Sequence, residues 1–142
     1  MKKILALGFI LFGTKAFALE TLANVTGDNY SVSSVHECMM TGWTSAEPST
    51  DQTATARTML DNLHTFIADR IENIQSLGRN VLAAWVRHPV SLTEVNTARS
   101  DLDAAVNPVK DEVTSTTVGI INLLTVAQRG KFDKAFATCM HQ

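Results

Sequence analysis

The sequence is poor both in residues that interrupt secondary structure and in residues that commonly carry chemistry. Its 142 residues include three prolines, seven glycines, two cysteines and one tyrosine. It contains no glycine-rich phosphate loop, G-x-S-x-G elbow, H-E-x-x-H pair or C-x-x-C pair, so the usual signatures of nucleotide binding, serine hydrolysis, zinc proteolysis and dithiol redox chemistry are missing. We therefore predict that the protein is not an enzyme.

Long apolar runs are also scarce, and the clearest one lies at the start of the chain. Lys2 and Lys3 precede the apolar stretch Ile4 to Phe12, and Ala16-Phe17-Ala18 has the small-x-small pattern of a cleavage site. The run is about ten residues, well short of the ~20 that span a bilayer. We predict a signal peptide over residues 1–18, export to the periplasm, a mature chain that begins at Leu19, and no membrane span.

Positive charge is limited as well. The chain has 12 basic and 14 acidic residues, and the predicted signal peptide contains three of the basic ones, Lys2, Lys3 and Lys15. The predicted mature chain therefore has nine basic and 14 acidic residues, which gives it a net charge of −5. A nucleic-acid-binding surface or a polybasic membrane patch has the opposite balance. We expect no nucleic-acid partner.

The two cysteines, Cys38 and Cys139, both belong to the predicted mature chain, and neither is placed for lipid attachment at the cleavage site. Cysteines of exported proteins are usually paired, because the periplasm is oxidising. A bridge between them would close a loop of about a hundred residues, which the loop-entropy model rates at up to ~4.7 kcal/mol. The alternatives are two free thiols that bind a metal or form intermolecular bridges.

Two long amphipathic helices dominate the predicted structure. From Thr50 to about Arg87, apolar residues recur every three or four positions, which predicts a helix on the order of 55 Å long. His88-Pro89-Val90 interrupts the pattern, and Ser91 with Glu94 three residues later marks a new helix start. The two apolar stripes, which should pack as an antiparallel hairpin, consist of Leu60, Leu63, Ile67, Ile71, Ile74, Leu77, Val81 and Trp85 in the first helix and Leu92, Val95, Ala98, Leu102, Ala105, Val109, Val113, Thr116, Ile120 and Leu123 in the second.

Pro108 lies inside the second stripe, and because proline removes a backbone donor we expect a kink there. Within the first stripe, His64 is interpreted as a packing residue at the stripe's edge. Asp61, Asp69 and Glu72 are assigned to the solvated face.

Shorter helices are predicted at both ends of the mature chain. Residues 19–49 form a polar segment with one short apolar helical face, which we expect to stop at Gly42 and which includes Val32, Val35, Met39, Met40 and Trp43. A C-terminal helix carrying Phe132, Phe136 and Met140 should begin at Thr125, with Gln128 completing a capping box and Leu124 acting as a hydrophobic staple. Ser49 and Gln52 have the same capping pattern. The fold class is all-α, and residues 19–49 and 50–142 form a single domain.

One cluster of residues around the cysteines has the side chains of a metal site. His36, Met39 and Met40 surround Cys38, while Met140 and His141 adjoin Cys139, so a disulfide would gather imidazole and thioether groups. Such soft ligands suit Cu(I). The alternative is that the methionines pack beneath the bridge and the histidines are exposed. The chain has no H-x-x-x-H pair, so we expect no cofactor and keep a copper or zinc ion as the alternative.

The segment Leu124-Thr125-Val126-Ala127-Gln128 resembles the L-T-x-x-Q signature of the Spy/CpxP-like periplasmic proteins, a family that includes stress chaperones and metal-resistance proteins of the CnrX and ZraP type. The order of long helix, proline turn, long helix and motif helix over residues 50–137 is similar too. Pro48-Ser49-Thr50-Asp51-Gln52 looks like a degenerate first copy of the motif. The likeness covers about two thirds of the predicted mature chain.

The resemblance implies a curved hairpin that pairs as a cradle-like homodimer and binds unfolded or envelope proteins. The leading hypothesis is an ATP-independent periplasmic chaperone or envelope-stress adaptor. A metal-responsive sensor or resistance protein and a structural helical partner of another envelope protein are the alternatives. The chain departs from the family in lacking the H-x-x-x-H pair of the metal sensors and in being acidic where the cradles of chaperones are basic.

Overall fold

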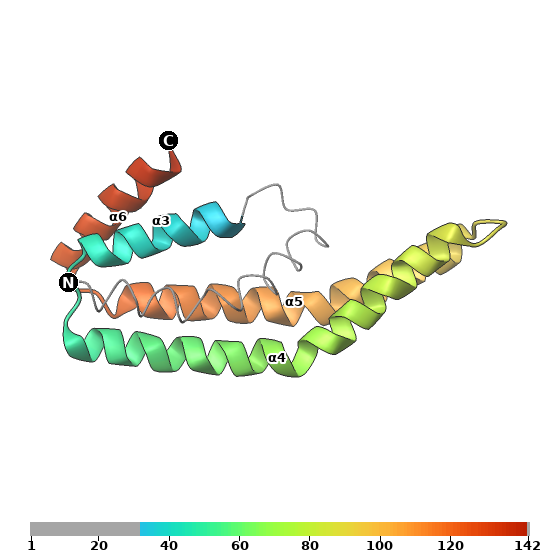
Figure 1. The fold of residues 1–142 in the computed structure, drawn as a ribbon, viewed down its shortest axis with the longest axis horizontal. Helices are drawn as coiled ribbons and strands as arrows, with labels where there is room; N and C mark the ends of the chain where they lie inside the picture. The colour runs from blue at the N-terminus through green and yellow to red at the C-terminus, as the bar shows by residue number, and fades with distance from the viewer. Residues whose placement is uncertain (1–31, 142) are drawn as a thin grey trace. The chain divides into compact units, whose positions relative to one another are not determined.

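The structure, a computed structural model, describes residues 32–141 of the chain. The predicted signal peptide, the expected start at Leu19 and the first part of the polar segment lie outside these residues. The described residues form four helices: α3 (Val32–Ser45), α4 (Thr50–Val86), α5 (Leu92–Asn122) and α6 (Val126–Met140) (Figure 1). The predicted all-α class with a long helical hairpin is confirmed.

The chain divides into two compact units. In the described part of the chain, the first comprises residues 32–57 and 119–141, and we call it the terminal unit. It contains α3, α6, the first residues of α4 (50–57) and the last residues of α5 (119–122). The second comprises residues 58–118, and we call it the hairpin unit. The two units are described separately below.

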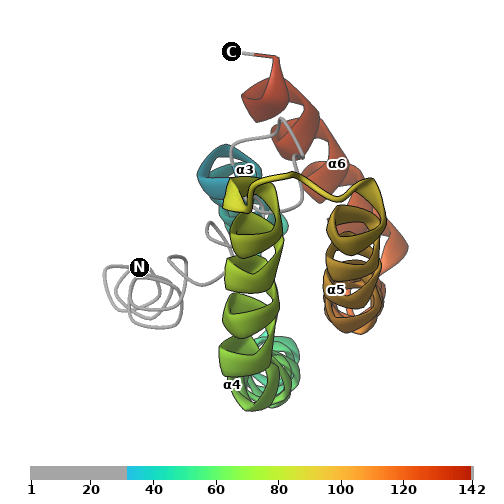
Figure 2. The same ribbon diagram turned by 90° about the vertical axis from the view of Figure 1, so that its right-hand side faces the viewer.

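In the hairpin unit, α4 and α5 run antiparallel and side by side in both views (Figures 1 and 2). The turn between them arises from local chemistry. Pro89 cannot continue a helix without disturbing the residue before it, and α4 ends at Val86. The hydroxyl of Ser91 accepts a hydrogen bond from the Glu94 backbone N–H at 3.3 Å, which is the predicted cap of α5.

The apolar stripes of the two helices form the interior of the hairpin unit. Val95, Val106 and Val109 are the most completely buried side chains. Most of the predicted stripe residues are buried or partly buried, and Val106, which the prediction left out beside Ala105, is buried as well. The buried positions recur at helical spacing; they are Leu63, Ile67, Ile74, Ala84, Val95, Leu102, Val106, Val109 and Thr116. His64, which was predicted at the edge of the stripe, is buried, while Asp61, Asp69 and Glu72 are exposed, as predicted.

The stripes were predicted wrongly at the end next to the turn. Trp85 is 54% exposed and Leu92 is 72% exposed. After Val81 the helical period allows either the third or the fourth residue to face inward, and the structure buries Ala84. The larger indole therefore projects outward.

In α5 the helix continues through Pro108, which is exposed. The kink expected there stays a prediction. No helix in the described part of the chain is long and apolar enough to cross a membrane.

The terminal unit is built on the packing of α3 against α6. Gly42 was expected to end the first helix, but α3 continues to Ser45. A side chain at Gly42 would stand 2.8 Å from the Phe132 ring and 3.2 Å from its carbonyl oxygen. The glycine therefore lets the two helices approach closely. It is a packing residue and not a stop signal.

A small apolar core surrounds this crossing. Ala46, Leu124 and Phe132 are buried, and they pack with the partly buried residues Met39, Trp43, Ile121 and Phe136. Phe132 and Phe136 stack with ring centroids 5.9 Å apart. The staple prediction for Leu124 needs correction, because the position that it would meet four residues into α6 is Arg129. Leu124 is buried against Ala46 and Phe132 instead.

Candidate functional site

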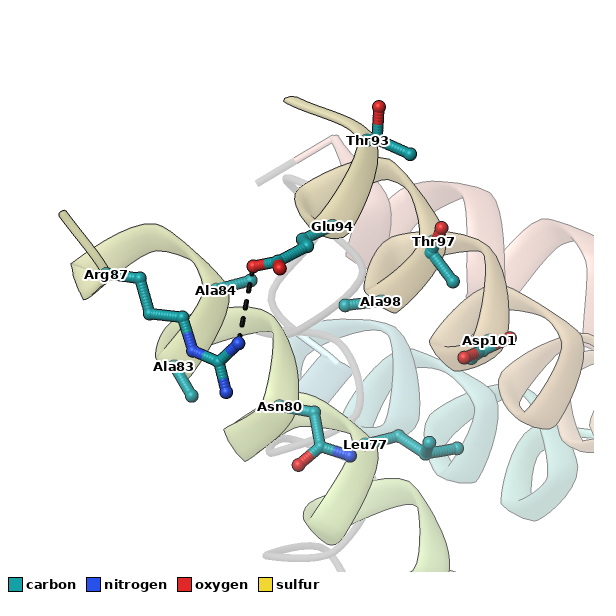
Figure 3. Close-up of a pocket in the computed structure, with 10 residues that line it drawn as sticks. All are labelled: Leu77, Asn80, Ala83, Ala84, Arg87, Thr93, Glu94, Thr97, Ala98 and Asp101. Carbon is teal, nitrogen blue, oxygen red and sulfur yellow. Dashed lines mark hydrogen bonds and ion pairs between the residues drawn. The ribbon is translucent and has the colours of Figure 1, made fainter. Parts of the chain in front are cut away.

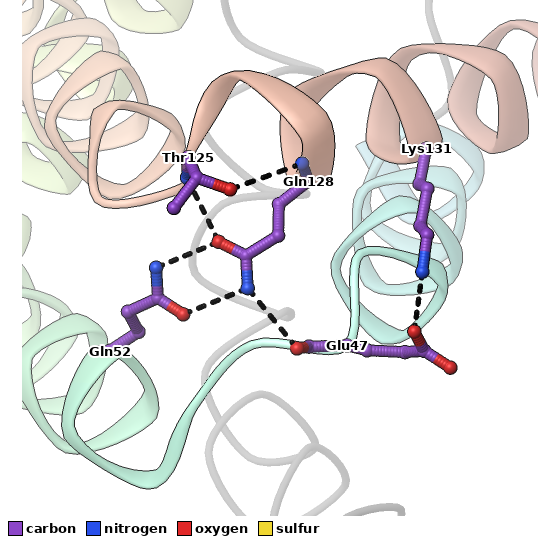
Figure 4. A network of polar contacts seen from close by, with 5 residues as sticks. All are labelled: Glu47, Gln52, Thr125, Gln128 and Lys131. Atoms are coloured by element: carbon purple, nitrogen blue, oxygen red, sulfur yellow. Dashed lines mark hydrogen bonds and ion pairs between the residues drawn. The ribbon is translucent and has the colours of Figure 1, made fainter.

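The two predicted capping boxes both form, and they lie next to each other in the terminal unit. In the first, the Gln52 backbone N–H donates to the Ser49 hydroxyl at 3.1 Å, and the Gln52 side-chain oxygen accepts from the Ser49 N–H at 2.7 Å. In the second, Thr125 and Gln128 make the same two bonds at 3.3 and 2.9 Å (Figure 4). Both boxes satisfy backbone donors that a helix start leaves unpaired.

The two glutamines also bind each other, and we call this arrangement the glutamine clasp. The Gln52 amide nitrogen donates to the Gln128 oxygen at 2.9 Å, and the Gln128 nitrogen donates to the Gln52 oxygen at 3.1 Å (Figure 4). Each nitrogen has one further acceptor: the Leu123 carbonyl for Gln52, at 2.7 Å, and the Glu47 carbonyl for Gln128, at 3.2 Å. Both accepting residues lie two positions before a cap, so the pattern is two-fold symmetric.

The clasp gives the motif residues an architectural role. Both amide groups use their donors and acceptors within the protein, which leaves little capacity for a ligand. The ion pair of Lys131 with Glu47 lies beside the clasp, and this lysine lowers the pKa of the Glu47 carboxyl through a hydrogen bond and its charge. The arrangement joins the starts of α4 and α6.

The predicted Cys38–Cys139 disulfide is present, with the two Cα atoms 5.4 Å apart. It ties α3 to α6 within the terminal unit. Cys38 is buried and Cys139 is partly exposed. The bridge favours an oxidising compartment, in agreement with the predicted export.

The candidate metal ligands around the bridge differ in exposure. His36, Met39 and Met40 are partly buried, whereas Met140 is 38% exposed and His141 is exposed. Burial lowers the pKa of the His36 imidazole, and the charge of Glu37 partly counteracts this shift. Across residues 32–141, no three His, Cys, Asp or Glu side chains gather as a metal-binding group. The copper or zinc alternative stays a prediction.

The hairpin unit exposes apolar side chains at the turn between its helices. Five large apolar residues there are between 46% and 72% exposed, and we call this group the hairpin tip: Leu82, Trp85, Val86, Val90 and Leu92. The first three share one face of α4 by their helical spacing. The other large apolar residues found exposed are scattered, at Val118, Val126 and Met140.

A shallow groove lies between α4 and α5 next to the hairpin tip (Figure 3). Leu77, Ala84 and Ala98 contribute apolar surface, and Asn80 and Thr97 contribute polar groups. Across it, the Arg87 guanidinium of α4 pairs with the Glu94 carboxylate of α5 at 3.4 Å. Asp101 lines the end of the groove away from the turn. The groove therefore combines apolar, polar and charged side chains.

Charge is unevenly distributed along the hairpin unit. Between Glu72 and Asp101 the chain has three exposed arginines, Arg79, Arg87 and Arg99, and one carboxylate, Glu94. The rest of residues 58–118 has the opposite balance, with two basic residues and seven acidic ones: Arg70 and Lys110 against Asp61, Asp69, Glu72, Asp101, Asp103, Asp111 and Glu112. Residues 73–100 therefore carry a net charge of +2, and the remainder, which includes Asp101 at the far end of the groove, carries −5.

The hairpin tip was not recognised as a site from the sequence. Trp85 and Leu92 were assigned to the buried stripes because they continue the helical period. A signal was available, since Leu82, Val86 and Val90 fall between the stripe positions and make the segment apolar on more than one face. The excess of basic over acidic residues between residues 73 and 100 is also visible in the sequence.

Comparison with known proteins places this chain in no group: no family model, curated protein or solved structure matches it. The resemblance to the Spy/CpxP-like proteins therefore depends on the two motifs and on the order of the helices.

Proposed function

We propose that the protein is a non-catalytic binding protein of the bacterial envelope, which holds apolar segments of other proteins on its hairpin tip. It acts there as an ATP-independent chaperone or stress adaptor. The exposed tip is the observation that carries this proposal. Large apolar side chains gathered on a surface are typical of interaction sites, whereas isolated ones are common everywhere.

The chemistry of the tip suits reversible contact. Trp85 offers a large apolar surface with few rotatable bonds, and tryptophan is enriched among residues that dominate binding energy. Leu82 and Val86 flank it on the same helical face. Ordering such side chains on binding costs little, and a short apolar contact of this size releases its partner readily.

Location in the periplasm is part of the proposal. The Cys38–Cys139 disulfide and the signal peptide predicted over residues 1–18 support it. The cradle-like homodimer of the Spy/CpxP-like proteins is proposed on the resemblance alone. In the hairpin unit, most of the exposed large apolar residues lie at the tip, and Val118 is exposed farther along α5.

The test is suppression of aggregation of a chemically denatured model protein by the purified mature protein, with and without a chelator. Leu82→Ser with Trp85→Ser should abolish most of the suppression, because both residues are exposed contact residues. Val118→Ser with Val126→Ser is the matched control, since it removes two exposed apolar side chains elsewhere. Circular dichroism should show equal helicity for all variants.

The result can contradict the proposal in three ways. Equal loss in the control variant would show that general hydrophobicity, and not the tip, is responsible. Loss of activity with the chelator would support the metal-responsive alternative. Absence of suppression together with tight binding to one envelope protein would support the structural-partner alternative.

A further inference from the structure

Charge and apolar surface coincide at one end of the hairpin unit. The three arginines between Glu72 and Asp101 lie on the helices that carry the hairpin tip. Arg79 and Arg99 are each seven residues from a tip residue, Val86 and Leu92 respectively, which corresponds to about 10 Å along a helix. Basic groups therefore stand within a Debye length of the apolar contact surface.

Building on the function proposed above, we infer that the hairpin tip selects apolar protein segments that are flanked by acidic residues. The apolar part contacts Trp85 and its neighbours, and the flanking carboxylates lie near Arg79 and Arg99. The acidic remainder of the hairpin unit repels the same carboxylates. A segment of this kind is consequently held at the tip and excluded from the rest of the hairpin.

The ion pair of Arg87 with Glu94 contributes to this selection. Both side chains are more than half exposed, so their attraction is weak in water and is easily exchanged for another partner. An incoming carboxylate can compete with Glu94 for the guanidinium of Arg87. A basic segment would instead leave Arg79 and Arg99 facing like charge.

A protein segment fits the tip better than a lipid surface does. Asn80, Thr93 and Thr97 line the groove beside the tip, and amide and hydroxyl groups are the kind that bond the polar backbone of an extended chain. A bilayer surface is broad and has no extended backbone to enter the groove between two helices. Vesicles are therefore included below as a competing occupant.

The experiment measures fluorescence anisotropy with three labelled peptides that share one apolar core and differ in their flanks: three Asp, three Ser or three Lys on each side. At low salt we expect the acidic peptide to bind about fivefold more tightly than the neutral one, as two or three exposed charge pairs would give. The basic peptide should bind most weakly. At 1 M salt, where the Debye length falls to ~3 Å, the three affinities should converge.

Two pairs of variants separate the contributions. Arg79→Gln with Arg99→Gln should remove the acidic preference and leave binding of the neutral peptide within about twofold of wild type. The matched control, Arg57→Gln with Lys134→Gln, removes the same charge from the exposed surface of the terminal unit and should keep the preference. The variant with Leu82→Ser and Trp85→Ser should show no binding of any of the three peptides. Thermal melts confirm that each variant is folded.

The outcomes distinguish this inference from the function on which it depends. Tip-dependent binding with equal affinities for the three peptides would overturn the acidic preference and leave the proposed function standing. If the peptides bind equally well after the Leu82 and Trp85 substitutions, both the acidic preference and the proposed function are wrong. If phosphatidylglycerol vesicles, but not phosphatidylcholine vesicles, displace the acidic peptide completely at low lipid concentration, the occupant is an anionic membrane and the inference is wrong.

Discussion

The terminal unit and the hairpin unit use the same kind of helix in opposite ways. In the terminal unit, a disulfide, a close glycine contact and the glutamine clasp connect segments that are far apart in sequence. In the hairpin unit, two stripes of aliphatic side chains and one exposed ion pair connect α4 to α5. Specific contacts between distant segments are therefore found in the terminal unit. Apolar surface is left exposed at the hairpin tip, where contact with a partner is proposed.

The largest expected effect is loss of the disulfide. Cys38→Ser with Cys139→Ser should destabilise the protein by about 2–4 kcal/mol, because the bridge restricts a loop of about a hundred residues in the unfolded chain. In a thermal melt followed by circular dichroism this corresponds to a melting temperature several degrees lower. Binding at the hairpin tip should largely survive. Loss of binding together with the bridge would show that the two units are not independent in function.

Next in size is the glutamine clasp. Gln128→Ala removes the acceptor of the Thr125 N–H and the two hydrogen bonds between the glutamine amides, and should cost about 1–3 kcal/mol in chemical denaturation. Gln52→Ala should cost a similar amount. The double variant should cost less than the sum, by at least about 0.5 kcal/mol, because each glutamine loses its partner in either single variant. Strict additivity would mean that the amide pair is not formed in solution.

Alanine substitutions at two glycines should change stability by a smaller amount and in opposite directions. Gly42→Ala should destabilise by about 1–2 kcal/mol, since a Cβ there overlaps the Phe132 ring. Gly78→Ala, in the hairpin unit, meets nothing within 4 Å and should stabilise by up to about 1 kcal/mol through helix propensity. Equal shifts in urea midpoint for the two variants would contradict the close packing of α3 on α6.

The smallest expected effect concerns the ion pair beside the clasp. Lys131 holds the pKa of Glu47 below its ordinary value, so the carboxylate is favoured in the folded state. This stability is present above the ordinary pKa of glutamate and is lost as the pH falls through the lowered one. A carboxyl-carbon NMR titration should show Glu47 titrating lower than in the variant Lys131→Met. An unchanged pKa in that variant would place the cause elsewhere.

Many contacts of the terminal unit could be predicted residue by residue, because they depend on short sequence patterns. The pattern Ser-x-x-Gln or Thr-x-x-Gln favours a capping box in many surroundings, and two cysteines in a chain with a predicted signal peptide imply a bridge. That the two boxes meet could not be predicted, since Gln52 and Gln128 are 76 positions apart. Gly42 was misjudged for the same reason: its role depends on Phe132, which arrives from another helix.

The sequence by itself determined the two long helices, the starts of α4, α5 and α6, and the turn at Pro89, because helical period, caps and proline act over a few neighbouring residues. Only the tertiary structure decided which residue next to the turn faces inward. Ala84 and Trp85 fit the period equally well, and the choice depends on the approach of α5. That choice leaves Trp85 outside with Leu82 and Val86. The sequence shows that this segment is apolar on more than one face, but packing between the helices decides which of its residues form the hairpin tip.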